Sequence, residues 1–357
     1  MNNLMPSGRI GWIETLKGIT ICLVVIHHVT LTTQHFLLNE HGTSLPEGIL
    51  TLDQFLSYCR MPAFFFCAGL VFSRNIHKGR AWLINRRVLG AGWIIIVWTS
   101  LSYLFHMSGL KLIPWSDEKI HLFRALWSPF GVLWFMHAIM ICTITSFLLR
   151  NLSVKNQILV AVTLTIFTAH LSHYLSPTYG LRVMLDGLAA SGFLFFIAGS
   201  ALGSNATRII EDDRHVVFLF IFFILLIYLY LEVDRRSYFL DLLFLRIPIT
   251  FVFICFVRGL FDRFQQFGLF FSRLGARSLR IFVTHQFVIA TALAIWVDHI
   301  DEAFPRSMWL MLILFTAGGT FVTQKSVYRL TGGLAYEPPR WLALGRSANR
   351  PSSSVRG

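Results

Sequence analysis

Long apolar runs recur from one end of this chain to the other, separated by short polar and basic segments. Each run is close to the length of about 20 residues that an α-helix needs to cross the hydrocarbon of a bilayer. Runs of this length with few charges are typical of transmembrane helices. The predicted spans are residues 15–36, 54–73, 89–107, 131–149, 157–175, 183–203, 216–232, 238–257, 278–297 and 307–325. The pattern therefore predicts an all-α fold, a polytopic integral membrane protein of about ten transmembrane helices.

The composition supports a membrane protein. Hydrophobic residues make up 55% of the 357 residues, and charged residues make up 14%. A water-soluble protein of this length needs considerably more charge to cover its surface. The abundance of phenylalanine, at 34 residues, also suits helices that face lipid better than a surface that faces water.

The charges follow the alternation of the predicted loops. Most of the 31 lysines and arginines fall in the terminal segments and in every second loop. The opposite loops hold most of the carboxylates, namely Glu40, Glu47, Asp53, Asp117, Glu118, Asp298, Asp301 and Glu302. This bias obeys the positive-inside rule and predicts an even number of spans with both termini in the cytoplasm. We expect residues 1–335 to form one transmembrane domain and the polar residues 336–357 to be a disordered basic cytoplasmic tail.

The net charge of +13 does not indicate a nucleic-acid partner. The cations are spread over several cytoplasmic segments and do not form a folded basic domain. Membrane orientation and contact with anionic lipids account for most of them. The five cysteines lie mostly within predicted spans and show no paired spacing, so neither a disulfide framework nor a metal site is expected.

The first predicted span carries ionisable groups at positions where a bilayer normally excludes them. Lys17 lies near its start, three residues after Glu14, and His27 and His28 lie near its middle. Lys17 and His28 are eleven residues apart, which is close to three helical turns, so they share a face and are separated by roughly 16 Å. Ionisable groups in a membrane often mark a reaction centre or an ion path. The simpler alternative is that Lys17 extends to the interface and the histidines bond to neighbouring helices.

Four segments of the chain resemble the acyltransferase-3 family of polytopic membrane acyltransferases. That family opens with an Asp-x-Leu-Arg/Lys-Gly pattern and a histidine eleven residues after the basic residue. Residues 14–18 (ETLKG) and His28 resemble this pattern, with Glu14 and Lys17 in place of the commoner Asp and Arg. Residues 60–72 (RMPAFFFCAGLVF), 133–136 (LWFM) and 278–285 (SLRIFVTH) resemble later elements in the family order. Together the four segments extend over nearly the whole chain.

The resemblance implies a role for several residues. Three residues of the first helix would be catalytic: His28 as general base, with Lys17 as electrostatic partner and Glu14 paired to it. His27 faces about 100° away from His28 and is expected to be a neighbour. The family's arginines after the second span bind the phosphates of acyl-coenzyme A, and Arg86 and Arg87 match them best, followed by Arg80. Basic residues in this loop are also explained by membrane topology alone.

Four further polar residues are candidates for a substrate cavity. His285 and Ser278 belong to the late SLRIFVTH element, and His137 directly follows the LWFM element. Arg246 falls inside the predicted span 238–257, where it either lines the cavity or extends to the outer face. A role in helix packing is the alternative for His137 and His285.

The resemblance predicts an O-acyltransferase of the bacterial inner (cytoplasmic) membrane. It would move an acetyl group from acetyl-coenzyme A (acetyl-CoA), without a metal, to a hydroxyl of a bacterial polysaccharide or lipid-linked glycan, such as an exopolysaccharide or O-antigen. Either His28 deprotonates this hydroxyl directly or it carries the acyl group as an acyl-imidazole. Two alternatives remain, an acyltransferase that acts on a lipid or peptide, and a proton-coupled secondary transporter.

Overall fold

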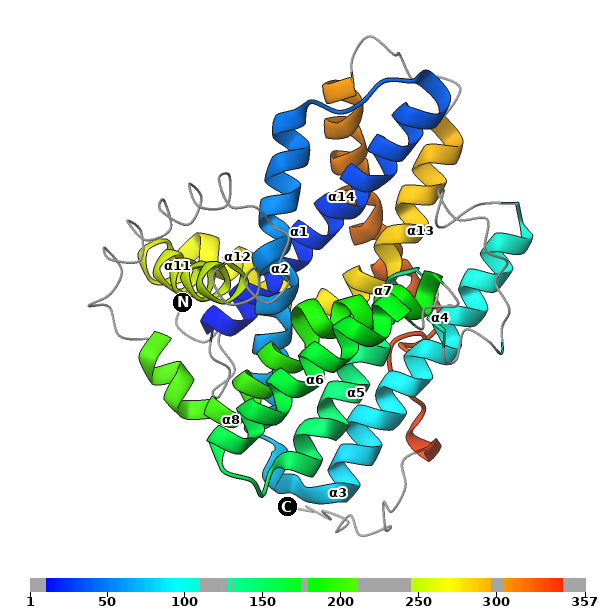
Figure 1. Ribbon diagram of the computed structural model, residues 1–357. Coiled ribbons are helices and arrows are strands. Elements are labelled where there is room, and N and C mark those ends of the chain that lie inside the picture. The colour runs from blue at the N-terminus through cyan, green and yellow to red at the C-terminus, as the bar shows by residue number, and fades with distance from the viewer. Residues whose placement is uncertain are drawn as a thin grey trace, which may run out of the picture.

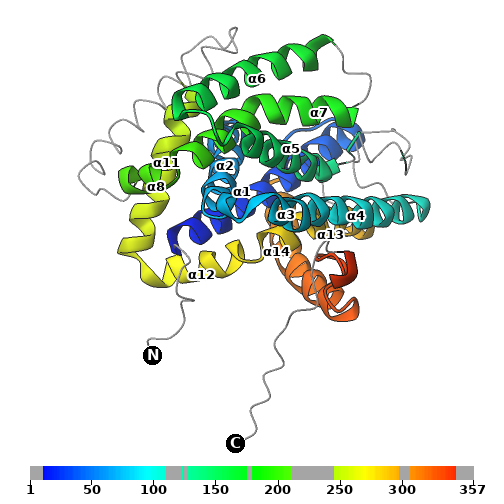
Figure 2. The same cartoon turned by 90° about the horizontal axis from the view of Figure 1, so that it is seen from below.

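The computed structural model describes residues 11–109, 131–174, 179–210, 245–296 and 305–342, together with residues 123, 128 and 129. Within these residues the regular elements are all helices, and there is no strand. The helices form a bundle in which α1 and α2 run side by side through the centre (Figure 1). Seen from below, α6 lies on one side of this pair and α14 on the other (Figure 2).

The elements have the following bounds. The α-helices are α1 (Gly11–Phe36), α2 (Glu47–Ser73), α3 (Gly79–Trp82), α4 (Leu89–Met107), α5 (Trp134–Leu149), α6 (Val154–Tyr174), α7 (Tyr179–Gly187), α8 (Phe193–Ile210), α11 (Ile247–Arg263), α12 (Gln265–Gly275), α13 (Ser278–Trp296) and α14 (Pro305–Leu330). Three π-helical turns are η1 (Leu37–His41), η3 (Leu83–Val88) and η6 (Leu188–Gly192). Short 3₁₀ helices are η2 (Ile76–Lys78), η5 (Gly131–Leu133) and η10 (Arg340–Leu342).

Eight helical stretches of the described chain are long and apolar enough to cross a membrane. They are Gly11–His41, Glu47–Ser73, Ile76–Met107, Gly131–Leu149, Val154–Tyr174, Tyr179–Arg208, Ser278–Ile295 and Ser307–Leu330. Each overlaps one of the predicted spans, and several extend beyond it. The predicted span 216–232 and the first part of 238–257 lie outside the described residues, and α11 covers the second part. The chain is an all-α, multi-pass membrane protein.

Helix α6 shows how a span with several polar residues fits a membrane. Its buried side includes Gln157, Thr165, Thr168 and Ser172, and Ser172 donates a hydrogen bond to Asp186 of α7. The opposite side exposes large apolar residues such as Phe167. These four polar residues therefore face protein, and apolar residues such as Phe167 remain available to lipid.

Two helix crossings depend on reciprocal glycines. A Cβ atom on Gly18 of α1 would lie 1.9 Å from the carbonyl oxygen of Phe271, and one on Gly275 of α12 would lie 1.8 Å from that of Glu14. Where α2 crosses α8, the corresponding distances are 2.1 Å from Gly69 to Phe196 and 2.3 Å from Gly199 to Phe66. Small residues allow helix backbones to approach this closely in membrane proteins.

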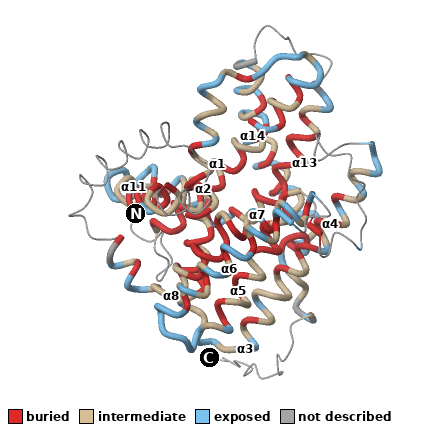
Figure 3. The backbone as a smooth tube through the Cα atoms, in the orientation of Figure 1, coloured by how far each residue is buried: buried red, intermediate tan, exposed pale blue. Residues whose placement is uncertain are grey.

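The buried residues gather in the middle of the bundle, and the exposed ones lie towards its periphery (Figure 3). The segment after α14 also joins this core. The indole nitrogen of Trp98 donates to the carbonyl of Ala335 at 2.8 Å, and burial raises the pKa of the Tyr336 phenol to about 12. Tyr336, the first residue of the predicted tail, is thus packed against the bundle, and residues 343–357 lie outside the described part of the chain.

Candidate active site

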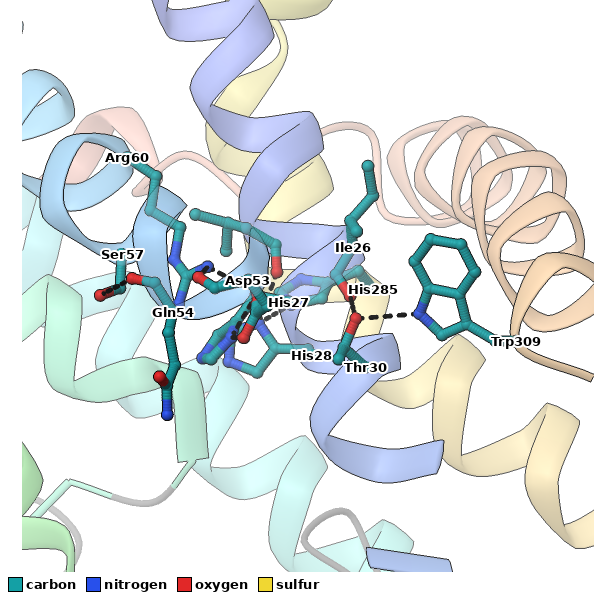
Figure 4. Close-up of polar contacts among 11 residues, drawn as sticks. Ile26, His27, His28, Thr30, Asp53, Gln54, Ser57, Arg60, His285 and Trp309 are labelled. Carbon is teal, nitrogen blue, oxygen red and sulfur yellow. Dashed lines mark hydrogen bonds and ion pairs between the residues drawn. The ribbon is translucent and has the colours of Figure 1, made fainter. Parts of the chain in front are cut away.

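Helices α1 and α13 bring His28 and His285 into contact. Nδ1 of His28 lies 3.3 Å from Nε2 of His285, and the two rings meet edge to face with 4.9 Å between their centroids. His285 is fully buried, whereas His28 is half-buried. The prediction placed His285 in the substrate cavity, and the structure places it against the predicted base (Figure 4).

The hydrogen bonds assign the protons on both rings. Nδ1 of His28 lies 2.8 Å from the carbonyl oxygen of Val24, and Nδ1 of His285 lies 3.2 Å from that of Ile281. Because a carbonyl oxygen can only accept, each Nδ1 carries the hydrogen. Nε2 of His285 is then the acceptor towards His28, and Nε2 of His28 keeps an unprotonated lone pair. That nitrogen is able to take a proton or to attack a carbonyl carbon.

A second polar cluster joins α1 to α2 beside these histidines. Nδ1 of His27 lies 2.8 Å from Oδ2 of Asp53, and Nη1 of Arg60 donates to Oδ1 of Asp53 at 2.8 Å and to its backbone carbonyl at 3.2 Å. Arg60 is only 5% exposed, so its charge requires such a partner. The rings of His27 and His28 are 5.2 Å apart, which makes the two clusters neighbours.

Sequence reasoning missed Asp53 and Arg60. The charge pattern assigned Asp53 to the carboxylates of the outer loops. Arg60 was noted only as the first residue of the family-like segment 60–72. The signal that identifies them is their spacing of seven residues, two helical turns on one face of a span. An acid and a base paired within a transmembrane helix mark a functional site by default.

The predicted ion pair at the start of α1 is present. Nζ of Lys17 lies 3.0 Å from Oε2 of Glu14 and 3.3 Å from Oε1. Helix α12 packs across this pair, since Gly275 contacts the backbone of Glu14 and Thr15 donates to the carbonyl of Gly268 at 2.9 Å. The side chain of Lys17 keeps 22% of its surface accessible.

The three arginines predicted to bind the donor lie after the end of α2. Arg80 in α3 and Arg86 in η3 are exposed, and Arg87 is half-buried with its guanidinium 5.3 Å from the centre of the Trp82 ring. These elements lie at the opposite end of the bundle from the connection between α1 and α2 (Figure 1). Helix α2 covers about 30 Å between Asp53 and Ser73, so the arginines are not adjacent to the histidines.

The other candidate residues are less closely connected to this site. His137 is buried in α5, with Nδ1 3.0 Å from the carbonyl oxygen of Leu133. Ser278 is buried at the first position of α13, two turns before His285. The guanidinium of Arg246 lies 4.8 Å from the centre of the Tyr58 ring, a cation–π contact with α2. In the part of the chain that the structure describes, no three His, Cys, Asp or Glu side chains are grouped to hold a metal ion.

The comparisons with known proteins agree with the sequence resemblance. A family model described as an acyltransferase domain, of the acyltransferase-3 type, matches residues 10–324. The inner membrane protein YcfT of Escherichia coli strain K12 is 33% identical over 89 residues, which cover 24% of this chain and 25% of that protein. The chain thus matches about a quarter of the length of this relative. No solved structure gives a significant match. The chain belongs to the acyltransferase-3 family.

Proposed function

We propose that this protein is a membrane O-acyltransferase that transfers an acetyl group from acetyl-CoA to a hydroxyl of a bacterial polysaccharide or lipid-linked glycan. The observation that carries the proposal is the imidazole of His28, which sits within a transmembrane helix and keeps a lone pair on Nε2 because Nδ1 is engaged by Val24 and His285. Membership of the family supplies the reaction class, acyl transfer. Similarity to an inner membrane protein supports a location in the bacterial inner membrane.

The donor would approach from the end of the bundle that carries the basic segment. Acetyl-CoA bears a diphosphate and a 3′-phosphate, which guanidinium groups bind through charge-assisted hydrogen bonds. Arg86 and Arg80 are exposed and able to bind these groups, and Arg87 is held by its contact with Trp82. With the termini in the cytoplasm, as the charge distribution predicts, this segment faces the compartment that contains acetyl-CoA. Lys17 would then attract the negative charge of the donor towards α1.

The chemistry requires removal of a proton from the acceptor hydroxyl and cleavage of the thioester. The proton passes to an imidazole, the oxygen of the acceptor forms the new ester bond, and the C–S electron pair leaves with the sulfur of coenzyme A, which takes up a proton. Nε2 of His28 would serve either as the base in a single step or as the atom that carries the acetyl group between two steps. His285 would hold the ring of His28 in the reactive tautomer.

A glycan is the acceptor class that we propose, with an exopolysaccharide unit or O-antigen as candidates. A lipid or peptide hydroxyl would use the same histidines and differ only in how the acceptor is held. A proton-coupled transporter would also use intramembrane histidines, but family membership favours acyl transfer.

The test is a transfer assay with purified protein in lipid nanodiscs, ¹⁴C-acetyl-CoA, and lipid-linked glycans extracted from bacterial membranes. We expect label in the glycan fraction with the wild-type protein, and at least a hundredfold less with His28→Ala, the size expected for loss of a general acid–base group. His170→Ala is the matched control, because His170 is exposed on α6 and contacts Tyr174 rather than the site. Full activity of His28→Ala contradicts the proposal. Label in a lipid or peptide fraction, with none in the glycan fraction, contradicts the glycan as acceptor and shows that the acceptor is a lipid or a peptide.

A further inference from the structure

His27 is a second basic imidazole of the site. Its Nδ1 lies 2.8 Å from a carboxylate oxygen of Asp53, which can only accept, so Nδ1 carries the hydrogen and Nε2 keeps a lone pair. The side chain retains 23% of its accessible surface. Helix α1 therefore presents two adjacent histidines, each with an unprotonated Nε2, and their ring centroids are 5.2 Å apart.

The two imidazoles differ in the groups that contact their Nδ1 atoms. Nδ1 of His28 faces neutral groups, the carbonyl of Val24 and the ring of His285. Nδ1 of His27 faces the carboxylate of Asp53, which Arg60 holds in place at 2.8 Å. A carboxylate in this position stabilises the imidazolium that forms when the ring accepts a proton. His27 is thus arranged as a base, whereas Nδ1 of His28 contacts a carbonyl and an imidazole instead of a carboxylate.

This difference matters for a transfer in two steps. In the second step of such a reaction the nucleophile is blocked by the acyl group, and a different residue has to deprotonate the acceptor. A transfer in one step needs a single base and gives no role to a second imidazole with its own carboxylate. We therefore propose that His28 carries the acetyl group as an acetyl-imidazole and that His27, oriented by Asp53 and Arg60, deprotonates the acceptor hydroxyl. This inference rests on the proposed function.

The two steps balance without a further reactant. First, Nε2 of His28 attacks the thioester carbon, the C–S bond breaks, and the electron pair leaves with the sulfur of coenzyme A as a thiolate, so that His28 becomes an acetyl-imidazolium with its hydrogen still on Nδ1. Then Nε2 of His27 takes the hydroxyl proton, the acceptor oxygen attacks the acetyl carbon, and the C–N electron pair returns to His28. Over the two steps His27 gains one proton from the hydroxyl and the thiolate of coenzyme A takes up one proton. Once His27 releases its proton, the protons balance.

The positions of the two clusters agree with this division. Lys17 lies near the start of α1, eleven residues before His28, at the end of the helix from which the donor is predicted to approach. Asp53 lies six residues after the start of α2, near the connection from α1 and away from the basic segment. The donor and the acceptor would thus meet the site from opposite ends, and a covalent intermediate allows one to leave before the other arrives.

The experiment follows label from ¹⁴C-acetyl-CoA in nanodisc-embedded protein by rapid quenching, first without acceptor and then with the lipid-linked glycan extract. For His27→Gln we expect release of coenzyme A and acetylation of His28 at wild-type levels, with transfer to the glycan reduced at least tenfold. Asp53→Asn is expected to behave in the same way, because the amide can stabilise the wrong tautomer of His27. Asp53→Glu should recover part of the transfer. Asp186→Asn is the matched control, since it disrupts an exposed ion pair with Arg182 at 3.9 Å.

Each result decides between the two schemes. Acetylated His28 that persists in His27→Gln supports the inference, and it also shows that the variant is folded, because the first step still occurs. Wild-type protein that transfers label without ever being acetylated contradicts the inference, as does full transfer by His27→Gln, and both leave the proposed function intact. Wild-type protein that neither releases coenzyme A nor labels any acceptor overturns the proposed function itself.

Discussion

Nδ1 of His28 and Nε2 of His285 meet at 3.3 Å, although the two residues are 257 positions apart in the chain. The first belongs to the opening element of the family resemblance and the second to its late element. Their contact places α13 directly against the part of α1 that carries the proposed base. Near them, Trp309 of α14 donates to the hydroxyl of Thr30 at 2.9 Å and joins α14 to the second half of α1 (Figure 4).

Replacement of His285 by leucine should slow the reaction without abolishing it. The change removes one hydrogen bond to His28 and leaves Nδ1 of that ring bonded to Val24. The loss of one hydrogen bond corresponds to about 1.4 kcal/mol, which is about tenfold in rate. We expect this decrease in kcat with little change in the KM for acetyl-CoA, measured by release of coenzyme A. A loss as large as that of His28→Ala would contradict the supporting role and place His285 among the reacting groups.

Removal of one partner of the buried pair between Arg60 and Asp53 should destabilise the protein. Arg60→Met leaves the carboxylate of Asp53 without its guanidinium, and breaking a buried pair in this way costs about 3 kcal/mol. The double variant Arg60→Met/Asp53→Leu removes both charges and should be the more stable of the two. Thermal unfolding in detergent gives the comparison. Equal Tm values for the single variant and the wild type would show that the pair contributes nothing to stability.

The sequence predicted the spans well because each apolar run has the length that a bilayer requires. Spans 89–107 and 131–149 agree with the structure to the residue, if η5 is counted with α5. Helix α2 begins at Glu47, earlier than the predicted residue 54, because Glu47 and Asp53 lie in its first two turns and lower their hydropathy. Helix α12 was not predicted, because its 11 residues are too few to cross a membrane.

The site was predictable only where its residues share one helix. Lys17 and Glu14 are three residues apart, so their ion pair follows from helix geometry. The partners of His27 and His28 lie on α2 and α13, and no periodicity of α1 determines which residues those helices present to it. His27 was therefore expected to be a neighbour of the predicted base, and its contact with Asp53 on α2 could not be read from α1.

Gly18 is predicted to be essential for the packing of α1 against α12. A Cβ atom at this position would lie 1.9 Å from the carbonyl oxygen of Phe271, a backbone atom that cannot move independently. Gly18→Ala should therefore lower the free energy of unfolding by about 1–3 kcal/mol, the cost of overpacking, and lower the Tm accordingly. Gly92→Ala on α4 is the matched control, because a Cβ there meets nothing within 4 Å. Similar Tm values for the two variants would contradict the close crossing.

The exposed arginines after α2 are predicted to bind the phosphates of the donor, and the Michaelis constant tests this directly. Arg86→Gln removes one charge-assisted hydrogen bond, worth about 1.5 kcal/mol, and should raise the KM for acetyl-CoA about tenfold with kcat nearly unchanged. The effect should shrink at high salt, because exposed charges are screened. Arg182→Gln, an exposed arginine whose partner is Asp186, is the control for loss of a positive charge. If Arg86→Gln and Arg182→Gln change the KM equally, then net charge and not a phosphate contact determines donor affinity, and Arg86 serves membrane topology instead.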